Sequence, residues 1–109
     1  MFNYMTHATT AEQIDAAINQ NSVTVLLFSA PWCGDCVFAN AFMEKVMKKY
    51  SDMNFLYVNR DDFMNLCEVL GIMGIPSFVA FKEGKEVGRF VSRFRKTEQE
   101  VCDFLDTVK

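Results

Sequence analysis

The sequence predicts an α/β fold in which a central mixed sheet of four to five strands is flanked by helices on both faces. Apolar runs typical of buried strands alternate along the chain with segments of helical periodicity. The strand–helix–strand order requires crossover connections, and these give parallel strand pairs. Two later strands follow each other across a short turn and predict an antiparallel hairpin. The 109 residues suit one domain, so we expect residues 1–109 to form a single domain.

The first half of the chain predicts two helices and two strands. Thr10 is a suitable N-cap for a short amphipathic helix in TTAEQIDAAINQ, with Gln13 three residues later. The run VTVLLFS (residues 23–29) is unbroken and rich in β-branched residues, as in a strand covered on both faces. A helix should follow the cysteine pair, with one buried apolar stripe. The residues expected in this stripe are Phe38, Ala41, Phe42 and Val46. FLYVN (residues 55–59) predicts the next strand, and Phe2–Met5 could add a short one.

The second half predicts two helices around a hairpin. The segment DDFMNLCEVLG is apolar at helical spacing, and Gly71 would end its helix in the left-handed conformation. SFVAFK and EVGRFVS predict two strands joined by the turn Glu83-Gly84-Lys85. Thr97 and Glu100 form a capping box at the start of the last helix. The residues that this helix should bury are Val101, Phe104, Leu105 and Val108.

Composition and charge exclude several classes of function. The formal net charge is -3, so the chain as a whole is not attracted to nucleic acid or to acidic membranes. The start, MFNYMTHATTAEQ, lacks the charged and apolar regions of a secretory signal, and no apolar run is long enough to span a bilayer. We therefore expect a cytoplasmic monomer with no nucleic-acid or membrane partner.

The stretch APWCGDC places two residues between Cys33 and Cys36. This spacing is found in redox pairs, in halves of zinc sites and in structural disulfides. A reducing compartment disfavours a structural disulfide. A structural zinc site needs four close ligands, whereas Cys67, Cys102 and the single His7 are scattered along the chain.

Three motifs follow one another along the chain. WCGDC directly follows the first long buried strand, GIPSF comes later, and FKEGKEVGRFV forms the hairpin before the last helix. In this order and at these separations they resemble the thioredoxin family, over nearly the whole chain. WCGDC and RDDF are also similar to a small thioredoxin-like subgroup of Gram-positive bacteria. The resemblance implies a thioredoxin fold and a thiol–disulfide oxidoreductase that reduces protein disulfides.

The resemblance and the predicted helix start assign roles to five residues. The strand should deliver Cys33 to the start of a helix, where unpaired N–H groups and the helix dipole favour a thiolate, so Cys33 is the expected nucleophile. Cys36 lies one turn further in, is more shielded, and is expected to resolve the mixed disulfide. The resemblance implies that Trp32, Ile75 and Pro76 bind the substrate, with a cis peptide before the proline.

The resemblance implies no metal and no organic cofactor beyond the redox-active Cys33–Cys36 disulfide. It implies a flavin-dependent thioredoxin reductase as the electron donor. Two other functions stay open: a non-catalytic binding module that docks a partner through Trp32, Ile75 and Pro76, and a reductase for low-molecular-weight disulfides. The second would use a basic run as an anion site, although such a run is usually a solvated surface and could also dock acidic partners. Its residues are Arg89, Arg93, Arg95 and Lys96.

The chain departs from the family pattern around the cysteines. Asp35 stands where most thioredoxins have proline, so Gly34 and Asp35 are expected to tune the redox properties. The Asp35 carboxylate should disfavour the Cys33 thiolate. The buried aspartate and lysine of many thioredoxins are replaced by Leu27 and Tyr57, so the usual buried proton relay is missing.

Three further residues have ordinary interpretations. Cys67 lies in an apolar stripe and is predicted to fill the core. Cys102 flanks the apolar face of the last helix and is predicted to be half exposed. His7, alone among threonines, is predicted to lie on the surface without a function.

Overall fold

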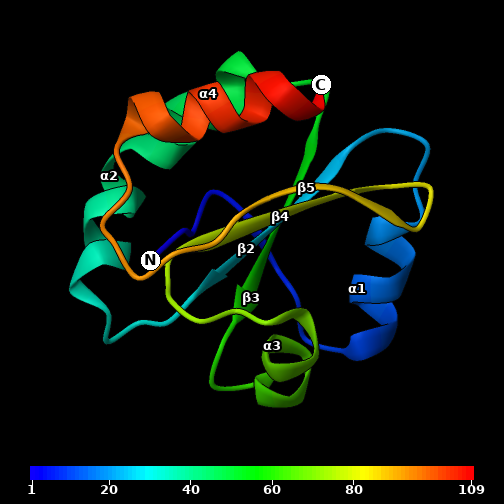
Figure 1. Ribbon diagram of the computed structural model, residues 1–109, viewed down its shortest axis with the longest axis horizontal. Helices are drawn as coiled ribbons and strands as arrows, with labels where there is room; N and C mark the ends of the chain where they lie inside the picture. The colour runs from blue at the N-terminus through cyan, green and yellow to red at the C-terminus, as the bar shows by residue number, and fades with distance from the viewer.

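The computed structural model describes residues 1–109 and contains five strands and four helices (Figure 1). In chain order they are β1 (Thr6–His7), α1 (Ala11–Ile18), β2 (Thr24–Ser29), α2 (Gly34–Lys49), β3 (Asn54–Asn59), α3 (Met64–Leu70), β4 (Ser77–Lys82), β5 (Lys85–Phe90) and α4 (Glu98–Val108). The sheet order is β1-β3-β2-β4-β5. β1, β3 and β2 run parallel, β4 is antiparallel to β2, and β5 is antiparallel to β4. The predicted α/β fold with a mixed sheet is confirmed.

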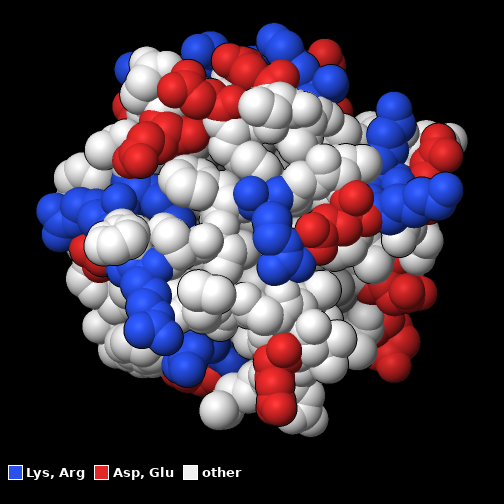
Figure 2. All heavy atoms as spheres, viewed as in Figure 1, with Lys and Arg blue, Asp and Glu red and all other residues white.

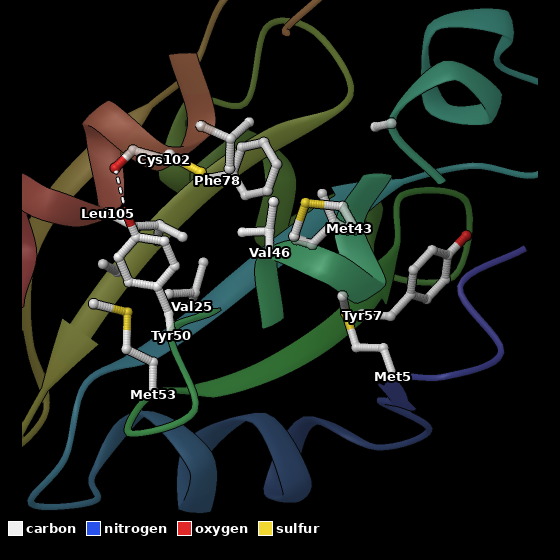
Figure 3. Packing of buried hydrophobic residues seen from close by; sticks show 14 of the residues in the cluster. Met5, Val25, Met43, Val46, Tyr50, Met53, Tyr57, Phe78, Cys102 and Leu105 are labelled. Carbon is white, nitrogen blue, oxygen red and sulfur yellow. Dashed lines mark hydrogen bonds between the residues drawn. The ribbon is translucent and has the colours of Figure 1, made fainter. Parts of the chain in front are cut away.

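Helices cover both faces of the sheet, α2 and α4 on one side and α1 and α3 on the other (Figure 1). Alternation along β2 divides its side chains between two cores. Val25 and Leu27 belong to the larger core beneath α2 and α4, and Leu26 and Phe28 belong to the smaller one on the other face. All six residues of β2 are buried, as its unbroken apolar run predicted. Figure 3 shows the larger core, with side chains from α2, α4 and the sheet.

Local signals define the predicted helix ends and the turn. The Thr97 hydroxyl accepts from the Glu100 N–H and the Glu100 carboxylate accepts from the Thr97 N–H, which completes the capping box. Gly71 ends α3 with φ 70°. Glu83 and Gly84 have φ 53° and 80°, and positive φ at both central residues is typical of tight hairpins.

The predicted buried stripe of α2 is confirmed for Val46 and wrong for Phe38 and Ala41, and Phe42 is half-buried. Phe38 and Ala41 are exposed, and the residues that α2 buries are Cys36, Ala39, Met43 and Val46. The ring of Phe38 packs edge-on against the half-buried ring of Phe42, with the ring centroids 6.0 Å apart. Helical periodicity allows either stripe, and the small Ala39 is completely buried in the larger core.

Two smaller expectations also need correction. Residues 2–5 do not form a strand, because the Met5 N–H donates to the Phe2 carbonyl in a turn and the Phe2 ring enters the core; the short strand is β1. Cys102 is buried and not half exposed, because α4 packs against the larger core.

Candidate active site

Cys33 lies where β2 has ended and α2 begins. It is the N-cap of α2, and its sulfur accepts from the Cys36 N–H at 3.3 Å. Backbone N–H groups at a helix start have no partner within the helix, and here one of them is aimed at the thiol. Cys33 is half-buried, whereas Cys36 is completely buried one turn further in. All four cysteines are free thiols.

The environment of Cys36 differs sharply from that of Cys33. Burial raises the pKa of the Cys36 thiol to about 12, and the hydrogen bond with Cys33 adds to the increase. The neighbouring Ser29 hydroxyl and the Ala30 backbone act in the opposite direction. Cys36 is therefore a protonated thiol at neutral pH, shielded from substrates.

The segment before β4 faces the cysteines. The Ile75–Pro76 peptide is cis, as the family resemblance implied. The Cys33 thiol donates to the Ile75 carbonyl at 3.7 Å, so this corner lies beside the half-buried sulfur. The loop that follows β5 packs closely here: a Cβ added at Gly74 would clash with the Ser92 carbonyl oxygen and lie 2.7 Å from Arg93 Cα.

Trp32 projects beside Cys33 with 63% of its surface exposed. Its indole N–H donates to the Asp61 carboxylate at 2.8 Å, and the Arg60 guanidinium lies 5.9 Å from its ring centroid. Arg60 and Asp61 belong to the RDDF segment, but the sequence analysis assigned them no place in the site. Their signal was available, because they directly follow β3, and the carboxyl ends of parallel neighbouring strands meet at the same edge of a sheet.

Asp35 is engaged by a residue that the sequence did not connect with it. Its carboxylate accepts from Arg95 Nε at 3.0 Å, and the same guanidinium lies 4.5 Å from the Phe38 ring centroid. A cation therefore faces the carboxylate that was expected to act on Cys33. The ion pair ties the start of α2 to the loop before α4.

The four-residue basic run does not form one surface. Lys96 is buried, and its ammonium donates to the Ser92 and Phe94 carbonyls at 2.9 and 2.8 Å. Burial lowers the pKa of Lys96. Arg89 is held by Glu86 and by the Leu70 carbonyl on another part of the surface.

The remaining members of the run lie beside the cysteines. Arg93 and Arg95 are exposed on the loop before α4. Figure 2 shows basic side chains gathered along the edge of the molecule where the chain enters α2 and α4 in Figure 1.

The layer behind the cysteines contains hydroxyls where many thioredoxins have charges. Leu27 is fully buried, and Tyr57 beside it is 4% exposed. Burial raises the pKa of Tyr57. The fully buried Ser29 hydroxyl has no hydrogen-bond partner. His7 is exposed as predicted, yet its ring stacks on Tyr57 with centroids 4.2 Å apart.

The geometry also bears on the open alternatives. No group of three or more His, Cys, Asp or Glu side chains is arranged to hold a metal ion. Cys67 lies in the smaller core, as predicted, and Cys102 lies in the larger one. None of the three main hollows of the surface is lined by Cys33, Trp32 or Pro76. None of the helices has the length and apolar character needed to cross a membrane.

Comparisons with known proteins agree with the fold and the cysteine motif. The Thioredoxin family model matches residues 5–107. A thioredoxin of Callithrix jacchus is 37% identical over 95 residues, which cover 86% of this chain and 89% of that protein. The mitochondrial thioredoxin-2 of Schizosaccharomyces pombe is 35% identical over 80 residues, which cover 73% of this chain and 60% of that protein. The crystal structure of Fasciola hepatica thioredoxin superposes with a TM-score of 0.84 at 27% identity, covering 96% of this chain and 100% of that one.

Proposed function

Because this chain belongs to the thioredoxin family and is a thiol–disulfide oxidoreductase that reduces protein disulfides, we propose that Cys33 attacks the substrate and Cys36 releases it. The observation that carries this assignment is the asymmetry of the two thiols. Cys33 is half-buried with a helix N–H aimed at its sulfur, whereas Cys36 is fully buried with a pKa of about 12. The attacking species in disulfide exchange is a thiolate that the substrate can reach.

The reaction has two exchange steps. The Cys33 thiolate attacks one sulfur of the substrate disulfide, a mixed disulfide forms, and the other substrate sulfur leaves as a thiolate that takes a proton from water. Cys36 then loses its proton and attacks the Cys33 sulfur. The Cys33–Cys36 disulfide forms and the second substrate thiol is released, so two electrons move from the enzyme to the substrate.

Trp32, Ile75 and Pro76 hold the substrate beside Cys33. The exposed indole of Trp32 supplies an apolar contact, and the hydrogen bond to Asp61 fixes the ring without covering it. The backbone at Ile75 lies next to the Cys33 sulfur, where an extended substrate segment can pair with it. Such recognition reads the backbone, which suits an enzyme with several protein substrates.

The exposed basic residues beside this surface favour partners with acidic groups near the disulfide. Arg60, which is half-exposed, lies near the Trp32 ring, Arg95 pairs with Asp35, and Arg93 lies close to Gly74, although the chain carries a net charge of -3. Opposite charges on a partner would raise its association rate, and salt would reduce that gain. We propose that a flavin-dependent thioredoxin reductase restores the dithiol, and that the enzyme works as a cytoplasmic monomer without a bound cofactor.

The test compares the two cysteine variants. Given a dithiol donor, the wild-type protein should reduce insulin disulfides. Cys36→Ser should accumulate a mixed disulfide with the substrate, whereas Cys33→Ser should form none and should lose most of its alkylation by iodoacetamide at neutral pH. Equal trapping or equal labelling in the two variants would overturn the assignment. Reduction of small disulfides without reduction of insulin would instead support the low-molecular-weight alternative.

A further inference from the structure

We propose that the buried hydroxyl of Ser29, followed by the hydroxyl of Tyr57, carries to solvent the proton that Cys36 loses when it resolves the mixed disulfide. This inference rests on the proposed function, because it concerns the second exchange step. Leu27 is fully buried behind the cysteines, at the position where many thioredoxins have an aspartate. No carboxylate is therefore available there to take the Cys36 proton.

The sheet register brings Ser29 and Tyr57 together. Leu27 of β2 is opposite Tyr57 of β3, and Ser29 is opposite Asn59, so Ser29 and Tyr57 are diagonal neighbours in adjacent strands. Ser29 is on the same face of β2 as Leu27, by strand alternation. That face lies beneath α2, where Cys36, Leu27 and Tyr57 belong to one core.

The Ser29 hydroxyl is unusual in this molecule. It is the only buried side-chain oxygen or nitrogen without a hydrogen bond. A buried hydroxyl without a partner destabilises the folded state, and alanine would fill the same place without that cost. Folding therefore gives no reason for a serine here.

Ser29 lies beside both groups that the proposed route connects. Burial raises the pKa of the Cys36 thiol and of the Tyr57 hydroxyl, and in each case the neighbouring Ser29 hydroxyl partly offsets the increase. The Tyr57 hydroxyl also makes no hydrogen bond, and because it is not a buried atom, it is in contact with solvent. Figure 3 shows this hydroxyl pointing away from the packed side chains around Tyr57.

The charged and titratable groups near Cys36 offer no better acceptor. Lys96 has only donors and uses them on two carbonyls, and the Asp35 carboxylate is paired with Arg95. Asp61 accepts from Trp32 at the surface. The other groups facing this region are Cys33 before α2, Asp62 after β3, Glu100 of α4 and His7, which stacks on the Tyr57 ring.

The step balances with water as the final acceptor. The Ser29 hydroxyl makes no hydrogen bond in the resting protein, so it must approach both neighbours during this step. As the Cys36 sulfur forms its bond to Cys33, its proton passes to Ser29 Oγ, the Ser29 proton passes to the Tyr57 oxygen, and the Tyr57 proton passes to water. The bond between Cys33 and the substrate sulfur breaks, and the departing thiolate takes a proton from water. Both hydroxyls end neutral, so neither has to act as a strong base.

The experiment separates the two exchange steps in one reaction. The reduced protein is mixed with 5,5′-dithiobis(2-nitrobenzoate) under single-turnover conditions, and release of the coloured thiol is followed by stopped flow. The first phase reports attack by Cys33, and the second reports resolution by Cys36. Ser29→Ala should leave the first phase unchanged and slow the second about tenfold near neutral pH. This loss is smaller than the roughly 100-fold or greater loss expected when a full general base is removed. Ser29→Thr, which keeps a hydroxyl, should restore most of the rate.

The pH profile distinguishes proton transfer from a structural effect. The defect of Ser29→Ala should shrink as the pH rises, because hydroxide then removes the Cys36 proton directly. Tyr57→Phe should slow the second phase with the same pH trend, while the control Tyr50→Phe, which removes a buried hydroxyl at the other end of α2, should not. An unchanged second phase in Ser29→Ala, or one slowed equally at all pH values, would overturn the relay. Absence of the first phase in the wild-type protein would instead overturn the proposed function.

Discussion

The two ends of α2 differ in how well their polar groups are paired. At the C-terminal end, the Tyr50 hydroxyl donates to the Asp106 carboxylate at 2.7 Å and lies 3.0 Å from the Cys102 carbonyl, as Figure 3 shows in part. At the N-terminal end, the Ser29 hydroxyl is buried without a partner, Cys36 is a buried thiol, and the Trp32 ring is exposed.

This difference indicates that one end of α2 serves the stability of the fold and the other end serves the thiol–disulfide reaction. The C-terminal end of α2 is built like an ordinary core, with its buried hydroxyl satisfied. The N-terminal end retains groups that cost folding free energy, and these are the groups on which the two exchange steps depend. The comparison can be tested by matched substitutions at the two ends, because each end contains a cysteine and a hydroxyl that is close to a charge or a thiol.

The largest expected difference concerns the cysteines. Cys33→Ser should lower the turnover of insulin reduction more than about 100-fold, because the nucleophile is lost. Cys102→Ser, close to Tyr50, should leave turnover within about twofold of wild type while lowering the free energy of unfolding by about 1 to 3 kcal/mol through burial of a hydroxyl. A comparable loss of turnover in Cys102→Ser would show that the C-terminal end takes part in the reaction.

A second difference concerns packing at the reactive end. Gly74→Ala should lower the free energy of unfolding by about 1 to 3 kcal/mol, because its Cβ meets the backbone of Ser92 and Arg93, which cannot move aside as a side chain can. Gly34→Ala is the control, since nothing lies within 4 Å of its added Cβ. Urea unfolding of both variants tests this, and equal loss in the two would contradict the close approach of the loop.

The third prediction sharpens the comparison at the C-terminal end. Tyr50→Phe should lower the free energy of unfolding by about 1 kcal/mol without changing turnover. The Tyr50 hydroxyl holds the pKa of Asp106 below its usual range, so the unfolded state binds the proton more readily. This contribution is present above the pKa of an unfolded aspartate, about 3.9, and is lost as the pH falls through the lower folded value. The stability difference between wild type and Tyr50→Phe should therefore narrow in acid.

The smallest expected effect concerns Asp35. The carboxylate is paired with Arg95 on the surface, and an exposed ion pair contributes about 0.2 to 1 kcal/mol. Asp35→Asn should change the rate of Cys33 alkylation less than about threefold, and Arg95→Gln should slow it by exposing the carboxylate. The double variant should resemble Asp35→Asn. A large acceleration in Asp35→Asn alone would show that the ion pair does not screen this charge from Cys33.

The fold could be predicted from local patterns because strand burial, helix capping and turn formation each depend on the residue types within a short segment. The predicted buried strand is found in VTVLLFS, and the predicted capping box is found at Thr97 and Glu100. The predicted turn is found at Glu83. The buried face of α2 could not be predicted in this way. Periodicity permits two stripes, and the choice depends on how the helix meets the sheet and on the shielding of Phe38 by Arg95.

The sequence by itself determined the order of the elements, the family and the cysteine pair, because these depend on residue type and spacing within short stretches. Only the tertiary structure decided which charges and hydroxyls surround the pair. Asp35 and Arg95 are 60 residues apart, and Trp32 and Asp61 are 29 residues apart, so no local pattern links them. Ser29 and Tyr57 become neighbours only through the parallel register of β2 and β3. Long-range pairing in the sheet sets these distances, and the distances decide how a charge or a hydroxyl acts on a thiol.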